Sequence, residues 1–256
     1  MRTLMGAVLA LTVLYTLACV GLYLAQRSLI YFPQPRRHGA NNSVTSVQVG
    51  DVMLNVSTRE QPGRQAVVYF GGNAEDVSAN LPALSAAFPD QALYLLHYRG
   101  FGGSGGKPTE AALFADALAL YDQVKTQHPD ITVIGRSLGS GPALHLASVR
   151  PVQRLVLVTP YDSIAALAAQ QFPMFPVRWL LRDKFESFRF APLVKAPTLI
   201  IAAAQDEVIP PASTSLLATR FKPGIARTVT IPAVGHNTIS DDPAYARLLG
   251  GQPDTR

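Results

Sequence analysis

Cysteine is almost absent from this chain, with a single residue, Cys19, among 256. One cysteine excludes a disulfide framework and any zinc site built from cysteines, and it leaves the redox compartment open. Charged residues are also scarce at 15%, whereas hydrophobic residues make up 48%. A chain with this balance can bury a core, which argues against intrinsic disorder. Its length fits one or two domains.

Acidic residues are missing from the first 50 positions, where the charged side chains are Arg2, Arg27, Arg36 and Arg37. These four arginines account for +4 of the formal net charge of +5, so the remaining 206 residues are nearly neutral. A nucleic-acid-binding domain would gather lysine and arginine on its folded part. Here the excess flanks an apolar segment, so we expect a membrane as partner and no nucleic acid.

The apolar segment comprises the 24 uncharged residues from Thr3 to Gln26. As a helix it would extend ~36 Å, enough for a hydrocarbon core of ~30 Å. The apolar stretch of a cleavable signal peptide is shorter, about 7–15 residues. We therefore expect residues 1–27 to form an uncleaved transmembrane anchor through residues 3–26. A cleaved signal peptide and a buried soluble helix are the alternatives.

Residues 28–43 contain three basic residues and two prolines, and we expect a juxtamembrane linker there, followed by one domain over residues 44–256. The expected location is a single-pass protein of a bacterial-type inner or cell membrane. Arg2 and the terminal amine flank one end of the span, and three arginines flank the other. The positive-inside rule favours a cytoplasmic domain by one charge, which leaves the side open.

Strand-like and helix-like patterns alternate along the expected domain. Short apolar, β-rich runs occur at 44–56, 66–70, 92–98, 131–134, 155–158, 198–203 and 228–231. Segments with helical periodicity lie between them at 75–88, 109–127, 138–149, 164–171 and 212–221. Such alternation predicts an α/β fold, with a mainly parallel central sheet flanked by helices.

One serine has the context of a nucleophile elbow. Gly135-Arg136-Ser137-Leu138-Gly139 matches G-x-S-x-G and lies between a predicted strand and a predicted helix, as an elbow requires. Gly102–Gly106 has the same spacing but is followed by Lys107-Pro108 rather than by a helix. The candidate nucleophile is Ser137.

The loop Gly100–Gly106 also satisfies G-x-G-x-x-G, the pattern of a dinucleotide site. In such a site the helix begins within the motif, so that its amides hold the pyrophosphate. Pro108 and Thr109 delay the helix here, and the next predicted strand, 131–134, does not end in an acid. We expect a close turn at this loop, and no cofactor or metal for the protein.

A serine nucleophile needs a base, and of the five histidines only His236 follows the last predicted strand in a loop. The acid should lie between Ser137 and His236 in the chain, just after a strand. Asp206 follows the run 198–203 and is the first choice. Asp162 follows the run 155–158 and is the reserve, although a residue there is also suited to capping the next helix.

An oxyanion hole needs two amide donors. Leu138, directly after the candidate nucleophile, supplies one, and Asn73, in the Phe70-Gly71-Gly72-Asn73 turn after a strand, is the candidate for the other. A plain strand-ending turn is the alternative for that segment.

Together these residues resemble the α/β-hydrolase superfamily, in particular the membrane-anchored branch that contains acylglycerol and lysophospholipid lipases and protein depalmitoylases. The resemblance runs from about Tyr31 to His236 and is carried by 69–73, 98–104, 135–139, 159–163, Asp206 and Gly235-His236. Two positions depart from that branch, which usually has His at position 71, here glycine, and Gly at position 204, here alanine.

The resemblance implies a serine hydrolase that cleaves ester or thioester bonds through an acyl-enzyme, with Ser137, His236 and Asp206 as its triad. A peptidase of the same fold and a non-catalytic binding protein of that fold are the alternatives. The segment 172–181 is short, aromatic and apolar. It stands where such folds carry a lid, and it is either an acyl-binding cap or a helix packed along the sheet. An apolar lid beside a membrane anchor favours lipid-like substrates. The oligomeric state stays open.

Overall fold

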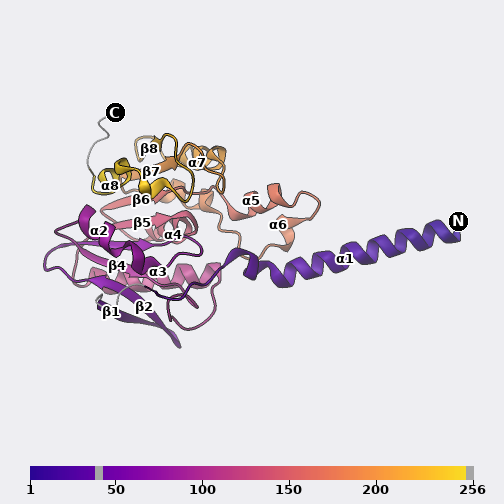
Figure 1. The fold of residues 1–256 in the computed structure, drawn as a ribbon, viewed down its shortest axis with the longest axis horizontal. Coiled ribbons are helices and arrows are strands. Elements are labelled where there is room, and N and C mark those ends of the chain that lie inside the picture. The colour runs from indigo at the N-terminus through magenta and orange to yellow at the C-terminus, as the bar shows by residue number, and fades with distance from the viewer. Residues whose placement is uncertain (38–42, 252–256) are drawn as a thin grey trace.

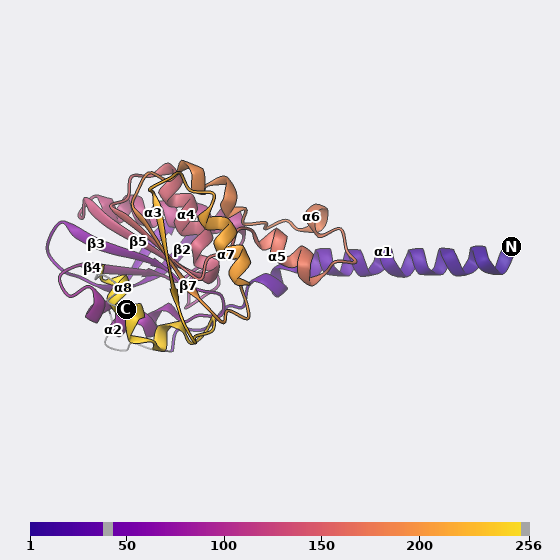
Figure 2. The same cartoon turned by 90° about the horizontal axis from the view of Figure 1, so that it is seen from above.

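The computed structural model describes residues 1–37 and 43–251. A long helix, α1 (Arg2–Ile30), projects from an α/β domain that contains the rest of the described chain (Figures 1 and 2). The helix continues three residues past the expected boundary at residue 27, and residues 38–42 of the expected linker lie outside the described part. Among the described residues α1 alone is long and apolar enough to cross a membrane, and its most apolar window is not buried in the protein.

Within the described residues eight strands form one sheet in the order β1-β2-β4-β3-β5-β6-β7-β8. The first two pairings, β1 with β2 and β2 with β4, are antiparallel, and all pairings from β4 to β8 are parallel. The strands are β1 (Ser43–Val49), β2 (Val52–Arg59), β3 (Gln65–Phe70), β4 (Ala92–Leu96), β5 (Asp130–Arg136), β6 (Arg154–Val158), β7 (Thr198–Ala203) and β8 (Ala226–Ile231). The predicted α/β fold with a mainly parallel sheet is confirmed.

The predicted single run 44–56 is wrong, because the chain reverses within it. Gly50 has φ +60°, a left-handed conformation that glycine adopts without a steric cost, and the turn at Gly50–Asp51 joins β1 to β2 as a hairpin. The two strands pair residue for residue from Ser43 with Thr58 to Val49 with Val52. The hairpin forms the antiparallel edge of the sheet.

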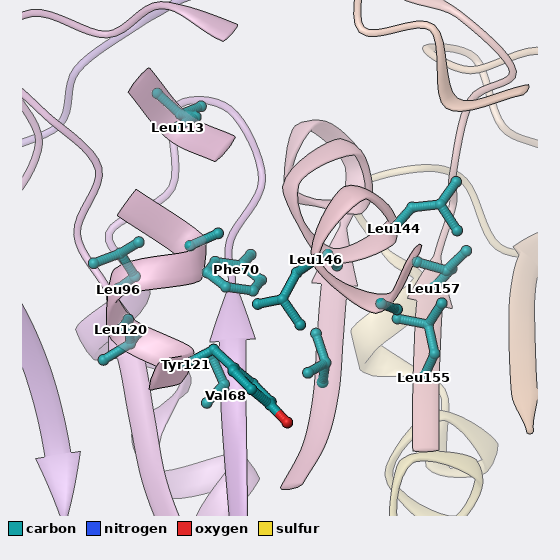
Figure 3. Packing of buried hydrophobic residues seen from close by; sticks show 14 of the residues in the cluster. Val68, Phe70, Leu96, Leu113, Leu120, Tyr121, Leu144, Leu146, Leu155 and Leu157 are labelled. Carbon is teal, nitrogen blue, oxygen red and sulfur yellow. The ribbon is translucent and has the colours of Figure 1, made fainter. Parts of the chain in front are cut away.

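Helices cover both faces of the sheet. One apolar cluster lies between the sheet and α3 (Glu110–Lys125), α4 (Ser140–Val149) and α7 (Pro211–Ala218), and Figure 3 shows Leu146 of α4 in this cluster with Phe70 and Val68 of β3. A second cluster lies under α2 (Leu81–Ala87) and α8 (Pro243–Leu249) on the other face. The central strands are buried on both faces, as their continuous apolar runs predict.

Two helices stand away from the sheet. After β6 the chain forms α5 (Ile164–Gln171) and α6 (Val177–Leu180), which lie beside the domain-proximal part of α1 (Figures 1 and 2). Met174 and Trp179, in and after the turn between them, are 80% and 89% exposed. The expectation of a helix packed along the sheet is therefore wrong for 172–181. We call residues 164–181 the lid segment.

Candidate active site

Ser137 lies at the sharp turn between β5 and α4. Its φ is +49°, a conformation that a residue with a side chain adopts only at a cost, and the 3₁₀ turn η2 (Ser137–Gly139) follows at once. Neither flanking glycine has room for a side chain. A Cβ at Gly135 would lie 2.5 Å from the Gly139 oxygen, and one at Gly139 would lie 2.1 Å from the Phe70 oxygen. The G-x-S-x-G spacing thus follows from backbone crowding at this turn.

Three side chains that are far apart in the sequence meet at the carboxyl edge of the sheet. His236 Nε2 lies 2.8 Å from Ser137 Oγ, and His236 Nδ1 lies 2.9 and 3.0 Å from the two oxygens of Asp206. All three residues are less than 10% exposed. The structure therefore brings together the serine, histidine and first-choice acid expected from the sequence.

Asp206 is held by its own loop. Its Oδ1 accepts hydrogen bonds from the backbone amides of Val208 (3.0 Å) and Ile209 (2.7 Å). These bonds fix the orientation of the carboxylate that contacts His236. The next residue, Glu207, accepts a hydrogen bond from the His236 amide at 3.1 Å, so the acid loop also fixes the backbone of the histidine loop.

The reserve acid, Asp162, lies elsewhere. Its Oδ1 is 3.5 Å from Arg220 Nε, and its backbone amide donates to Ser213 Oγ at 3.0 Å. The suggested capping role is wrong too, because Ser163 is the N-cap of α5 and accepts the hydrogen bond from Ala166. Asp162 is thus paired away from the Ser137–His236 pair.

The turn after β3 passes directly beside the serine. A Cβ built on Gly72 would lie 3.5 Å from Ser137 Cβ, and a Cβ on Gly71 would lie 2.4 Å from a Val77 methyl, so the histidine common at position 71 in the similar branch has no room here. Asn73 Oδ1 accepts hydrogen bonds from the amides of Phe32 and Ala74, both 3.0 Å. In the described part of the chain no acceptor takes the Asn73 amide hydrogen.

The second expected donor, Leu138, lies in the first turn of the helix that follows Ser137. Amides in the first turn of a helix have no intrahelical acceptor and point toward its N-terminal end. Asn73, Ser137 and Leu138 line one cavity. The two residues whose amides are expected from the sequence to form the oxyanion hole therefore line the same cavity as the serine.

A partly buried ion-pair network that the sequence did not suggest supports the turn. Glu75 accepts hydrogen bonds from the Gly72 amide (2.7 Å), the Tyr69 hydroxyl (2.7 Å) and Asn80 Nδ2 (2.5 Å). Burial raises the pKa of Tyr69 well above its usual range, so this hydroxyl keeps the proton that it donates. Arg136 lies 3.6 Å from Glu75 and donates to the His236 carbonyl at 3.5 Å. Arg136, adjacent to Ser137, thus joins the Gly72 turn to the histidine loop.

The cavity at the serine has a volume of about 500 Å³ and is mainly apolar. Its walls come from the 71–73 turn, the lid segment, the Asp206 loop and the domain-proximal end of α1. The contribution of α1 had no signal in the sequence, where the segment reads only as an anchor. Over residues 1–37 and 43–251 no group of three or more histidine, cysteine or acidic side chains could hold a metal ion.

Comparisons with known proteins agree with this architecture. The family model of the alpha/beta hydrolase fold matches residues 66–191. An uncharacterized protein of Mycobacterium tuberculosis is 35% identical over 231 residues, which cover 83% of this chain and 80% of that protein. The alpha/beta hydrolase domain-containing protein aho-3 of Caenorhabditis elegans is 34% identical over 59% of this chain and 46% of its own length.

Among solved structures, the Pyrococcus furiosus esterase Pf2001 is similar with a TM-score of 0.69, covering 86% of this chain and 97% of that one. Its sequence is 18% identical, so this likeness concerns the fold. The family model, the relative that covers 83% of this chain and the sheet order agree, and the protein belongs to the α/β-hydrolase fold family.

Proposed function

We propose that the protein is a membrane-tethered serine hydrolase that cleaves carboxylic ester or thioester bonds of acylated or lipid-like substrates through an acyl-enzyme. The observation that carries the proposal is the Ser137 Oγ to His236 Nε2 distance of 2.8 Å, with Nδ1 of the same ring on Asp206. In this arrangement the imidazole accepts the serine proton while the carboxylate fixes its tautomer.

In the first half-reaction Ser137 Oγ attacks the acyl carbonyl carbon, and its proton passes to His236 Nε2. The carbonyl π electrons move to the oxygen, and the amides of Leu138 and Asn73 stabilise that oxyanion. Asp206 stabilises the imidazolium that has formed. When the tetrahedral intermediate collapses, the bond to the leaving group breaks, and the alcohol or thiol leaves with the proton from Nε2.

In the second half-reaction a water molecule gives a proton to His236 Nε2 and attacks the acyl carbon of the Ser137 ester. The new tetrahedral intermediate collapses, the bond to Oγ breaks, and the serine recovers its proton. The products are a carboxylic acid and the alcohol or thiol. Every proton is moved by the side chains described above.

The apolar lining of the cavity supports acylated or lipid-like substrates, since an acyl chain bound there leaves water. The esterase name of a protein with the same fold is consistent with this reaction class.

The test is labelling by a serine-reactive fluorophosphonate, followed by hydrolysis of p-nitrophenyl esters with acyl chains from two to sixteen carbons. We expect labelling that disappears in Ser137→Ala, and kcat/KM that rises beyond four carbons. A labelled wild-type protein that prefers acetate would contradict the lipid-like substrate. Absence of labelling and of hydrolysis would favour the non-catalytic alternative.

A further inference from the structure

The lid segment is fixed to α1 along much of its length. At the tip of the segment the Tyr15 hydroxyl donates to the Met174 carbonyl at 2.9 Å, and its ring stacks on Phe175 at 5.8 Å. At the base Gln26 donates to the Leu180 carbonyl at 3.2 Å and accepts from the Arg182 amide at 2.6 Å.

Next to Gln26, Arg27 forms an ion pair with the nearly buried Asp183 at 2.9 Å. The contact of α1 with the lid segment and the two residues that follow it therefore runs from residue 15 to residue 27.

This contact encloses the cavity at Ser137. Leu22, Leu29 and Ile30 of α1 line the cavity, and so do Leu167, Phe172 and Leu181 of the lid segment. Ser137 and Leu138 line the same cavity. The cavity is therefore bounded by the catalytic edge of the domain and by the membrane-anchor helix itself.

The length of α1 fixes where the lid segment lies relative to a bilayer. About 20 helical residues cross a hydrocarbon core of ~30 Å. The span must fit within the uncharged residues 3–26. The placement farthest toward the N-terminus that avoids charged residues covers residues 3–22. Counted from residue 22, the end nearer to the domain, Tyr15 then lies seven residues, or ~10 Å, inside the hydrocarbon core. Any other placement puts Tyr15, and the Met174 it holds, deeper.

The tip of the lid segment has the chemistry that this depth demands. Pro173 and Pro176 carry no amide hydrogen, and the amides of Phe172, Phe175 and Val177 donate to carbonyls within the segment. The Met174 carbonyl is taken by Tyr15. Backbone groups in hydrocarbon need partners inside the protein, and these turns and prolines leave few free amide hydrogens at the tip.

The exposed side chains of the lid segment also suit this depth in the membrane. Met174, at the tip, is 80% exposed, and Trp179, nearer to Gln26, is 89% exposed. Tryptophan prefers the membrane interface, and the adjacent exposed Arg178 is long enough to reach lipid phosphates from there.

From these observations we propose that the tip of the lid segment is embedded in the membrane, and that the cavity between α1 and the lid segment takes the acyl chain of its ester substrate directly from the adjacent leaflet. The substrate class is a membrane-resident long-chain acyl ester or thioester, whose chain passes from lipid to the cavity without entering water. This part rests on the proposed function, whereas the membrane contact of the lid segment does not.

The membrane contact can be read from Trp179, the only tryptophan in the chain. The full chain is reconstituted in phosphatidylcholine vesicles with or without bromine atoms on the acyl chains. We expect bromolipid to quench at least half of the tryptophan emission and aqueous acrylamide to quench little of it. The control is Trp179→Phe combined with Val149→Trp, which moves the fluorophore to the exposed end of α4 at the opposite edge of the sheet. Emission from Trp179 that bromolipid leaves unchanged, as in the control, would overturn the proposal.

The acyl route is tested by a pair of variants on α1. Leu22 lines the cavity, whereas Leu24, two residues away on the other side of the helix, is 75% exposed and does not. The measurement is the ratio of kcat/KM for p-nitrophenyl palmitate to that for p-nitrophenyl butyrate in vesicles. We expect Leu22→Trp to lower the ratio at least tenfold and Leu24→Trp to leave it unchanged.

The two proposals fail differently. Equal ratios in both variants, with butyrate still cleaved in a Ser137-dependent manner, would refute the acyl route and leave the hydrolase intact. No hydrolysis of either ester by the wild-type protein would refute the hydrolase, while the bromolipid result would still decide whether the lid segment contacts lipid.

Discussion

Glu75→Gln is expected to slow turnover without weakening substrate binding. The carboxylate of Glu75 receives three hydrogen bonds, from Gly72, Tyr69 and Asn80, and faces Arg136. An amide has one acceptor oxygen in place of two, and its NH₂ group then faces donors. At least one donor therefore loses its partner or binds a weaker, uncharged acceptor, which costs ~1–3 kcal/mol.

The rate effect follows from the position of Gly72, which lies beside Ser137 in the turn that carries the Asn73 amide. If the ~1–3 kcal/mol is lost from stabilisation of the oxyanion, kcat falls roughly 5- to 150-fold, at ~1.4 kcal/mol per factor of ten. The upper value approaches the loss of a complete oxyanion donor, ~10²–10³. KM should change less than about threefold, because the ground-state carbonyl makes weaker use of the amide.

The assay is p-nitrophenyl butyrate hydrolysis, with kcat and KM determined separately and folding checked by thermal unfolding. Glu60→Gln, at an exposed position, is the matched control and should match the wild type. A folded Glu75→Gln protein with kcat within twofold of the wild type would refute the positioning role. A change confined to KM would place Glu75 in substrate binding instead.

The remaining predictions concern the acid, a buried histidine and the elbow. Asp206→Asn should lower kcat on the order of 10⁴-fold, whereas Asp162→Asn should stay within about tenfold, and the reverse result would exchange their roles. Burial lowers the pKa of His97 from 6.5 to about 4 in the folded protein. As pH drops from 6.5 to 4 the unfolded chain binds a proton that the folded chain does not, so the free energy of unfolding should fall by about 3 kcal/mol. Urea unfolding of His97→Gln should lack this increment, and identical pH profiles would contradict it. Gly139→Ala should destabilise the fold by about 3 kcal/mol through its clash with the end of β3, whereas Gly105→Ala, with its nearest neighbour at 3.6 Å, should cost far less in the same assay.

The sheet and the meeting of Ser137, Asp206 and His236 could be anticipated because both depend on local patterns and on chain order. Continuous apolar runs identify buried parallel strands, and residues that follow such strands gather at one edge of the sheet. The hairpin of β1 and β2 was missed because its turn, Gly50–Asp51, interrupts the apolar pattern only briefly. Strand periodicity alone does not reveal a reversal of direction.

The network of Glu75 and Arg136 could not be predicted from the sequence, since it joins a loop after β3 to the histidine loop 161 positions later. The same holds for the wall that α1 gives to the cavity. The α1 segment is apolar all round, so its sequence marks no face for packing. The partners of Gln26 and Arg27, Leu180 and Asp183, lie more than 150 positions away in the chain, so no local pattern marks these two residues as contacts.

The placement of α1 against the cavity bears on how the protein should be handled in the laboratory. Deleting residues 1–30 to obtain a freely dissolving domain would remove Leu22, Leu29 and Ile30, and would leave Asp183 without its cationic partner. Under the proposed function, the shortened protein would be a different catalyst, because its cavity would lack the residues that α1 contributes. Inhibitors selected on the shortened protein would be fitted to a cavity whose shape differs from that in the full chain.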